Sequence, residues 1–383
     1  MKWFGTKAAA AQGAGGGDAR PVLARAWGSG AVALGEWPAS YEAQLRAGVM
    51  GNAVAQRAMR LVSEGAGACA IKVRAPNIEG ADAARVTALV GQASAGQGLV
   101  ETLACHLLLH GNGYVQVIAG ADGMPAELFA LRPERVSVEA DARGWPAAYL
   151  YRVGESVTRL SPEDGAGRTS LLHLKSLHPL DDHYGLGCAG AAAGAVAIHN
   201  AASVWNKALL DNAARPSGAM VYDPGDGSVL SPDQYERVKR EMEAAFAGAA
   251  NAGRPMLLEG GLSWKAMSLT PAEMDFVGLK SAAAREIALA FGVPPMLMGL
   301  PGDNSYANYR EANKALWRQA ILPLVAKICA GLSQGLSGWW PGVAIEADLD
   351  AVPALSDERA ALWERVAAAD FLSAEEKKAM LGM

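Results

Sequence analysis

The sequence has few cysteines, and none of them forms a motif. The four that are present are widely spaced, with no Cys-x-x-Cys pair among them, and they are Cys69, Cys105, Cys188 and Cys329. This spacing argues against a zinc knuckle or a disulfide framework, because both need clustered or regularly spaced thiols. We therefore expect four small, mostly buried hydrophobic residues in a reducing compartment.

Charge of either sign is also scarce. Charged residues make up 19% of the 383 positions, and 34 Lys and Arg against 39 Asp and Glu give a net charge of −5. No dense block of Lys or Arg is present, although a protein that grips duplex DNA through its phosphates usually has one. Either nucleic acid is irrelevant to this chain, or the protein must let it slide.

What the sequence has in place of charge is small and apolar residues, with 51% hydrophobic residues and 44 glycines. The chain is long enough for two or three packed regions, and small side chains let helices approach closely within or between subunits. The start of the chain lacks the apolar stretch of a secretory signal, and the small-residue run at 185–198 is too short to span a bilayer. We expect no membrane association.

Motifs for catalysis or metal binding are weak. Residues 91–98 are Gly-rich and lead into a predicted helix, but they lack the Gly-Lys-Ser/Thr of a phosphate loop. His106 and His110 share a helix face without a third zinc ligand nearby, and the Asp-Asp-His run at 181–183 falls in a predicted loop. We expect no catalytic residues, no metal and no cofactor. The alternatives are an enzyme with an atypical nucleotide or metal site and a monomeric binding module.

Periodicity predicts an α+β chain that follows an Ala- and Gly-rich arm at 1–36, which we expect to be disordered in isolation. Period-two segments separated by turn signals over 114–153 predict an antiparallel β-meander. The predicted helices lie at 41–64, 98–110, 187–213, 231–248, 270–292, around 317–323 and within 356–382. The predicted strands lie at 70–74, 114–118, 127–131, 135–139, 148–153, 171–175, 218–222, 255–259, 263–269 and 343–349.

Local signals place several helix ends and one kink. Capping boxes at 231–234, 270–273 and 373–376 predict three helix starts, because a Ser or Thr side chain and a later Glu or Gln satisfy free backbone N–H groups. Pro323 falls inside a predicted helix and removes one backbone donor, so we expect a kink there.

The most specific segment is Ile-Ala-Leu-Ala-Phe-Gly-Val-Pro-Pro-Met-Leu-Met-Gly at 287–299, followed by Asn304, Asn308, Glu311 and the Ile-Leu-Pro at 321–323. It resembles the signature of the HK97-type phage portal family. Other segments resemble the family's pattern in the same order: Gly-Asn-Gly-Tyr at 111–114, 131–136, 173–175, 184–187, 253–261, Asp348, Asp350, Arg359, Ser373 and Glu375. The resemblance covers about residues 40–383.

The resemblance implies a portal fold and a ring of twelve subunits at one capsid vertex. Its implied parts are a wing at 37–186 and 294–350, stem helices at 187–214 and 269–293, a β-α-β clip at 215–268, and a short helical crown at 351–383. The second wing segment includes a tunnel loop at 299–306 and the kinked helix. The chain is short for the family, and a phage, a prophage and a gene transfer agent all remain possible sources.

The implied function is a channel for packaging and ejection of double-stranded DNA, which passes without sequence-specific contacts. A slightly acidic ring fits this role, because each fixed Lys or Arg on a phosphate would slow the DNA. The implied partners are the major capsid protein, the large terminase and a head–tail adaptor, in a virion or phage-like particle assembled in the bacterial cytoplasm.

The implied site residues lie in two loops. In the tunnel loop, Gly302, Asp303, Asn304, Ser305 and Tyr306 are expected to touch DNA without reading its bases; a plain connector within the wing is the alternative. In the clip, the expected partner contacts are Asp223, Asp226 and Ser228.

Overall fold

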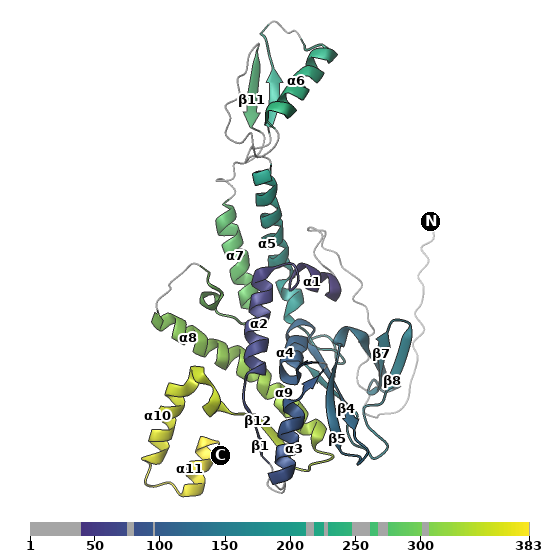
Figure 1. Ribbon diagram of the computed structural model, residues 1–383, viewed down its shortest axis with the longest axis vertical. Coiled ribbons are helices and arrows are strands. Elements are labelled where there is room, and N and C mark those ends of the chain that lie inside the picture. Colours follow the sequence, from purple (N-terminus) through teal and green to yellow (C-terminus); the bar gives the residue numbers. More distant parts are fainter. Residues whose placement is uncertain are drawn as a thin grey trace, which may run out of the picture.

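The computed structural model describes residues 40–74, 80–94, 96–211, 218–225, 229–246, 261–266, 275–300 and 306–382. A broad body lies at one end, two long helices run side by side away from it, and a small β-α-β unit lies at the far end (Figure 1). The expected arm at 1–36 lies outside the described residues. The mixture of helices and strands confirms the α+β class.

The body begins with two helices, α1 (Tyr41–Ala47) and α2 (Ala53–Gly67), where the sequence predicted one at 41–64. That prediction was wrong because Asn52 starts a new helix: its side-chain oxygen accepts hydrogen bonds from the backbone N–H groups of Val54 and Ala55, at 3.0 and 3.1 Å. Another helix, α3 (Gly80–Gly91), was not predicted. It packs beside strand β1 (Ile71–Arg74), which pairs antiparallel with β12 (Ala344–Ala347).

The predicted meander is divided between two three-stranded antiparallel sheets. One has the order β5-β4-β9, with β4 (Asn112–Ala119) between β5 (Pro125–Leu131) and β9 (Leu171–Lys175). The other has the order β6-β7-β8 and consists of β6 (Val136–Ala140), β7 (Pro146–Val153) and the unpredicted β8 (Ser156–Leu160). A short 3₁₀ turn, η1 (Pro133–Arg135), separates β5 from β6 and allows the chain to leave the first sheet. A short hairpin lies in the Gly-rich run before α4. Its strands, β2 (Ala93–Ser94) and β3 (Gln97–Gly98), have two residues each.

The core of the body surrounds α4 (Leu99–Leu109) and α9 (Leu322–Leu336). Helix α8 (Tyr306–Leu316) continues through a π-helical turn, η4 (Trp317–Ile321), directly into α9. A π-helical turn thus lies just before Pro323, the position of the predicted kink, and the run continues through Pro323 as α9. Between α7 and α8 lies a 3₁₀ turn, η3 (Pro295–Met298).

Among the described residues, one helix, Ala307–Leu336, is long and apolar enough to cross a membrane by length and composition. Core helices of globular proteins meet the same criterion. In this structure Val325, Ile328 and Leu332 of that helix are at most 1% exposed and pack into the protein's own core. The α9 part of this run is thus a core element.

The two long helices are α5 (Cys188–Asp211) and α7 (Phe276–Ala290), and the terminal unit consists of β10 (Gly218–Tyr222), α6 (Pro232–Phe246) and β11 (Leu262–Ala266). Strands β10 and β11 pair antiparallel. The capping box at the start of α6 is present, since Ser231 N donates to Gln234 Oε1 at 2.9 Å and Gln234 N donates to Ser231 Oγ at 3.3 Å. The predicted strand at 255–259 and the capping box at 270–273 lie outside the described residues. Helix α7, predicted to start at 270, begins at Phe276, because Asp275 Oδ1 accepts the Gly278 N–H at 3.1 Å and caps the helix there.

The chain ends in two helices beside the β1–β12 pair. After β12 come 3₁₀ turns η5 (Leu349–Ala351) and η6 (Pro353–Leu355), then α10 (Ser356–Ala367) and α11 (Ala374–Leu381). The predicted capping box at Ser373 and Glu376 is present in full. The segment 356–382, predicted to hold one or two helices, holds two.

Candidate functional site

Two glycine-rich motifs that lie far apart in the sequence meet backbone to backbone in the body. Gly111 has φ +82°, and a Cβ on it would lie 2.4 Å from the Leu186 carbonyl carbon. A Cβ on Gly185 would lie 2.0 Å from the Gly111 oxygen, and one on Gly187 would lie 2.3 Å from the Leu109 oxygen. No side chain fits at these three positions, so both motifs serve this junction between β4 and the start of α5.

The side chain of Asn112 holds the same junction together by hydrogen bonds. Its side chain is fully buried, and its Oδ1 accepts the backbone N–H of Gly185 at 2.7 Å and lies 3.0 Å from His173 Nε2. Its Nδ2 lies 3.0 Å from His110 Nδ1 and 3.3 Å from the Gly185 carbonyl. A buried amide is satisfied only by such a full set of partners. The junction therefore fixes the base of α5 against the sheet.

Three histidines, His106, His110 and His173, are partly buried in the body. Burial lowers the pKa of His106 to about 4 and that of His173 to about 3, so both are neutral near pH 7. The Tyr114 ring stacks on His173 with centroids 4.2 Å apart, and the Tyr41 ring meets His110 edge-on at 4.6 Å. Among the described residues there is no group of three or more His, Cys, Asp or Glu that could hold a metal ion.

The Asp-Asp-His run at 181–183 forms a turn. Asp181 Oδ1 accepts the backbone N–H groups of His183 and Tyr184, at 2.7 and 3.0 Å. The four cysteines are free thiols, and burial raises the pKa of each, which disfavours the reactive thiolate.

One catalytic sequence pattern was overlooked at the level of sequence. Residues 331–335 read Gly-Leu-Ser-Gln-Gly, which matches the Gly-x-Ser-x-Gly of a nucleophile elbow. The structure places this run at the C-terminal end of α9, not on a strand-to-helix turn. Ser333 Oγ donates to the Cys329 carbonyl at 2.8 Å and accepts the Ile345 N–H at 2.8 Å. The serine ties α9 to β12 and is not placed as a nucleophile.

The helix pair α5–α7 is anchored to the body near its base. Asn52 Nδ2 donates to Asn200 Oδ1 at 2.8 Å, and Asn200 Nδ2 donates to the Ala47 carbonyl at 2.8 Å. These contacts tie the α1–α2 turn to the middle of α5. Beyond them, the Trp205 and Phe276 rings stack with centroids 6.4 Å apart and join α5 to α7.

The helix pair carries large apolar side chains in contact with solvent, and we call these six residues the stem apolar set. Their exposed fractions are 39% for Ile198, 69% for Val204, 45% for Trp205, 83% for Val277, 42% for Leu279 and 77% for Leu289. Single exposed apolar residues are ordinary, whereas six on one helix pair leave a notable amount of apolar side chain in solvent.

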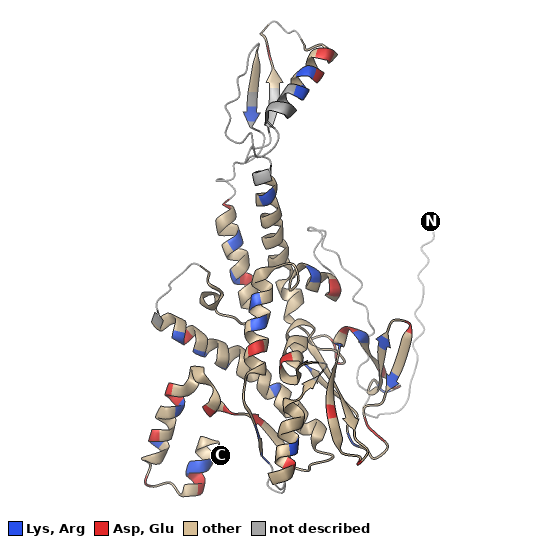
Figure 2. Ribbon diagram, viewed as in Figure 1, with Lys and Arg blue, Asp and Glu red and all other residues tan. Residues whose placement is uncertain are grey.

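The expected clip contacts are only partly within the described residues. Asp223 lies just after β10, where its Oδ1 accepts the Gly225 N–H at 3.1 Å and its backbone N–H donates to the Gly261 carbonyl at 2.8 Å. Asp226 and Ser228 lie outside the described residues. Helix α6 of the same unit carries charges of both signs on exposed positions (Figure 2).

Of the five expected tunnel-loop residues, only Tyr306 lies within the described residues, as the first residue of α8. The other four, Gly302, Asp303, Asn304 and Ser305, lie outside the described residues. The structure therefore places α8, the helix that follows this loop.

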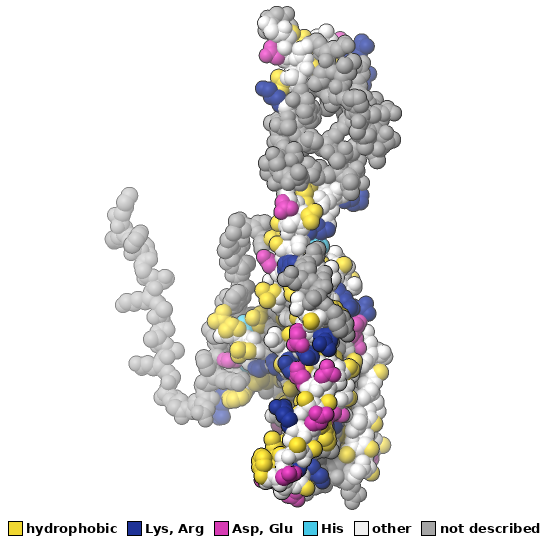
Figure 3. Space-filling view, turned by 90° about the vertical axis from the view of Figure 1, so that its left-hand side faces the viewer, with side chains coloured by type: hydrophobic (Ala, Val, Ile, Leu, Met, Phe, Trp, Pro, Cys, Tyr) yellow, Lys and Arg dark blue, Asp and Glu magenta, His cyan; other side chains and the backbone are white. Residues whose placement is uncertain are grey.

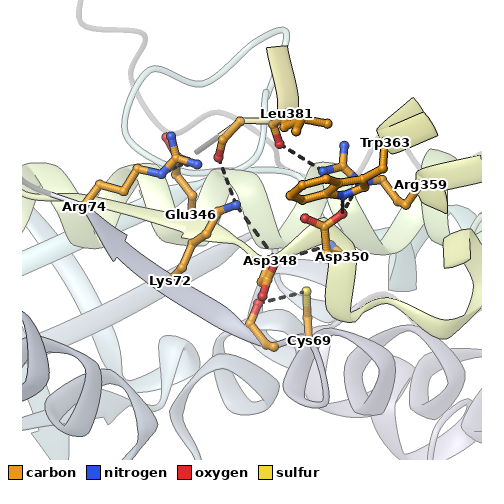
Figure 4. Close-up of polar contacts among 11 residues, drawn as sticks. Cys69, Lys72, Arg74, Glu346, Asp348, Asp350, Arg359, Trp363 and Leu381 are labelled. Atoms are coloured by element: carbon orange, nitrogen blue, oxygen red, sulfur yellow. Dashed lines mark hydrogen bonds and ion pairs between the residues drawn. The ribbon is translucent and has the colours of Figure 1, made fainter. Parts of the chain in front are cut away.

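A polar cluster at the C-terminal end was only half visible in the sequence (Figure 4). Asp350 accepts hydrogen bonds from Arg359 Nε at 2.5 Å and from Trp363 Nε1 at 3.1 Å, and these bonds lower the pKa of its carboxyl group. Arg359 also donates to the Leu381 carbonyl at 3.0 Å, and Lys72 of β1 donates to the Gly382 carbonyl at 3.1 Å. The family pattern pointed to Asp350 and Arg359, while Lys72 and Trp363 have no signal in the sequence spacing.

Surface charge is mixed on the face that carries α7, α8 and α10. Figure 3 shows positive and negative side chains intermingled over its lower half, with no broad field of one sign. Such a surface offers no continuous basic track to hold phosphates.

Comparison with known proteins identifies the family. The family model for the phage portal protein matches residues 53–382. One similar structure is a chain in the neck of a native gene transfer agent particle, and that neck was computed with C12 symmetry. It is 48% identical in sequence to this chain and has a TM-score of 0.67. The alignment covers 91% of this chain and 94% of that chain. An uncharacterized protein of Rickettsia bellii is 40% identical over 292 residues, which are 76% of this chain and 74% of that protein.

A more distant neighbour agrees in fold. The crystal structure of an HK97 family phage portal protein from Corynebacterium diphtheriae is 16% identical and covers 84% of this chain and all of its own, with a TM-score of 0.58. The family model for the phage portal protein matches the part of the chain that contains the body, the helix pair and the glycine junction. This chain belongs to the phage portal protein family.

Proposed function

We propose that this portal protein assembles into a ring of twelve copies at one vertex of a phage-like particle, and that double-stranded DNA passes through the ring during packaging and ejection. The stem apolar set carries the proposal, because six exposed large side chains on a two-helix stalk need a neighbour to cover them. A ring subunit has two different complementary faces that close by rotation. The 48% identity to a neck subunit of C12 symmetry supports the number twelve.

The test is the size and shape of the purified full-length protein. Light scattering after size exclusion should give a mass near twelve times 39.7 kDa, and negative-stain images should show a ring with a central hole. A protein that stays monomeric at assembly-like concentrations, and that is also absent as a ring from particles, would overturn the proposal.

The terminal β10–α6–β11 unit is proposed to dock the terminase during packaging and a head–tail adaptor afterwards. Its support is position, since it lies at the end of the stalk farthest from the body (Figure 1). Asp223→Asn should weaken capture of either partner by the ring. Asp141→Asn is the matched control, because Asp141 is an exposed turn carboxylate that accepts N–H groups of Arg143 and Trp145 far from this unit. If both variants captured the terminase and the adaptor equally well, Asp223 would not be part of the docking surface.

The tunnel loop is proposed to contact moving DNA. Shortening 301–305 should reduce packaging or retention of DNA in particles while rings still form, and normal retention would refute this contact. The proposal contains no catalytic step, because the portal family is structural, and we expect purified rings to show no nucleotide turnover.

A further inference from the structure

Helices α8 and α9 form one continuous run but differ in how firmly they are held. Helix α9 buries Val325, Ile328 and Leu332, each at most 1% exposed. In α8 the four residues at 307–310 are exposed, and the principal neighbours outside the run are the short turns η3 and η6. Few buried contacts and a solvent-exposed backbone characterise elements that open or move easily.

The π-helical turn Trp317–Ile321 lies where the two helices join. The backbone N–H of Leu322 donates to the carbonyl of Trp317, five residues back, and Pro323 follows without a donor. Ile321 is 1% exposed and fills the space above Gly65, where a Cβ would lie 2.6 Å from Ile321 Cδ1. A π turn with one fixed side chain marks the point about which α8 can change its angle.

A single carboxylate, that of Glu358 in α10, contacts the region where α8 meets the π turn. Glu358, in the first turn of α10, forms an ion pair with Arg318 of the π turn and lies 3.7 Å from Lys314 Nζ of α8. Lys314 Nζ also contacts Glu311 at 3.0 Å, and its side chain is only 16% exposed. Glu358 therefore joins α10 to the last turn of α8 and to the π turn.

Helix α10 is itself fastened to the body. Arg359, the next residue, is held by Asp350 and by the Leu381 carbonyl, and the Lys72 side chain holds the Gly382 carbonyl (Figure 4). Val352 and Leu355 are 1% and 6% exposed and bury the turns before α10 in the core. A continuous set of polar contacts thus runs from β1, through the two C-terminal helices, to the base of α8.

We propose that Glu358 is a positioning residue for α8, with the C-terminal helices as a latch and the π turn as the hinge. When the Glu358 contacts are made, α8 keeps its observed angle to α9, and when they are broken α8 fluctuates about Ile321. This mechanical claim holds for a single chain. Its consequence, control of how α8 is presented to DNA in the channel, rests on the proposed function.

Hydrogen exchange of the purified full-length protein tests the latch. In Glu358→Gln, peptides from 306–316 should exchange roughly threefold to fivefold faster than in the wild type, the effect expected for one partly exposed ion pair. Peptides from 322–336 should keep their wild-type rates. Salt at ~1 M, which shortens the screening length to roughly 3 Å, should speed exchange of α8 in the wild type and leave the variant nearly unchanged.

Two further variants separate positioning from general damage. Glu346→Gln removes the carboxylate that pairs with Arg74 at 3.5 Å on β12, and it should leave α8 exchange unchanged. The exchanged pair Glu358→Arg with Arg318→Glu should restore most of the slow exchange. Unchanged α8 exchange in Glu358→Gln, or no recovery in the exchanged pair, would overturn the latch, whatever the ring test shows.

Discussion

The body and the α5–α7 helix pair differ in the apolar surface that they leave exposed, although Ile287 of α7 is itself buried in the core of the body. In α9 the large side chains of Val325, Ile328 and Leu332 are at most 1% exposed, whereas Val277 and Leu289 of α7 are 83% and 77% exposed. The first pattern is that of a core complete within one chain, and the second is that of a surface completed by other chains. The comparison indicates that folding of the body and assembly through the helix pair can be disturbed separately.

The largest expected effect on the body comes from the glycine junction. Gly185→Ala places a Cβ 2.0 Å from the Gly111 carbonyl oxygen, and backbone cannot yield as a flexible side chain can. We expect a loss of about 3 kcal/mol in the free energy of unfolding, measured by denaturant titration. Gly80→Ala is the control, since no atom lies within 4 Å of its Cβ, and its effect should stay below about 1 kcal/mol. Equal stability of both variants would show that the junction is not rigid.

Acid should weaken the body next. The folded-state pKa values of His106 and His173, about 4 and about 3, lie below the unfolded value of roughly 6.5, so the unfolded chain takes up protons first as the pH falls. Stability is therefore full above the unfolded pKa and declines below it, by about 2 kcal/mol per histidine at a pH of about 5. Denaturation midpoints across this range measure the decline. His106→Leu should make it shallower, and an unchanged pH slope would contradict the assignment.

A smaller effect is expected at the C-terminal polar cluster. Asp350→Asn keeps the shape but removes the charge that holds Arg359, so we expect a loss of about 1.5 kcal/mol. Limited proteolysis should then cut within 356–382 sooner than in the wild type. Asp164→Asn provides a comparison, because Asp164 pairs with Arg168 in a separate loop. Unaltered cleavage at the C-terminal helices would show that apolar packing alone retains them.

Substitutions on the helix pair should have the smallest effect on the stability of the fold. They should have the largest effect on ring assembly. Val277→Asp combined with Leu289→Asp changes two exposed side chains, so the free energy of unfolding should shift by no more than about 0.5 kcal/mol each. Ring formation, followed by light scattering, should be lost, because charges would be buried between neighbours. Val157→Asp on β8, which is 49% exposed, should leave rings intact. Rings that persist in the double variant would show that Val277 and Leu289 are not needed for contacts between subunits.

Sequence patterns served well where the signal is local. Leu99, Leu103 and Leu107 recur at helical spacing, and all three are at most 2% exposed in α4. Helix α3 escaped prediction because its buried residues, Val86, Leu89 and Val90, are few and stand among Ala and Gly. The prediction of a single meander was wrong, because alternation shows which segments are strands but not which strands pair. Strand β9 pairs with β4 over a long sequence separation.

The sequence by itself determined the class of the fold, most helix and strand positions and the resemblance to portal proteins, because spacing, caps and glycine motifs act over a few residues. Only the tertiary structure decided that Gly111 and Gly185 meet through Asn112, and that Glu358 reaches Arg318. Such pairings depend on long-range packing of whole elements, and the spacing within one segment does not specify which distant segment will complete its hydrogen bonds.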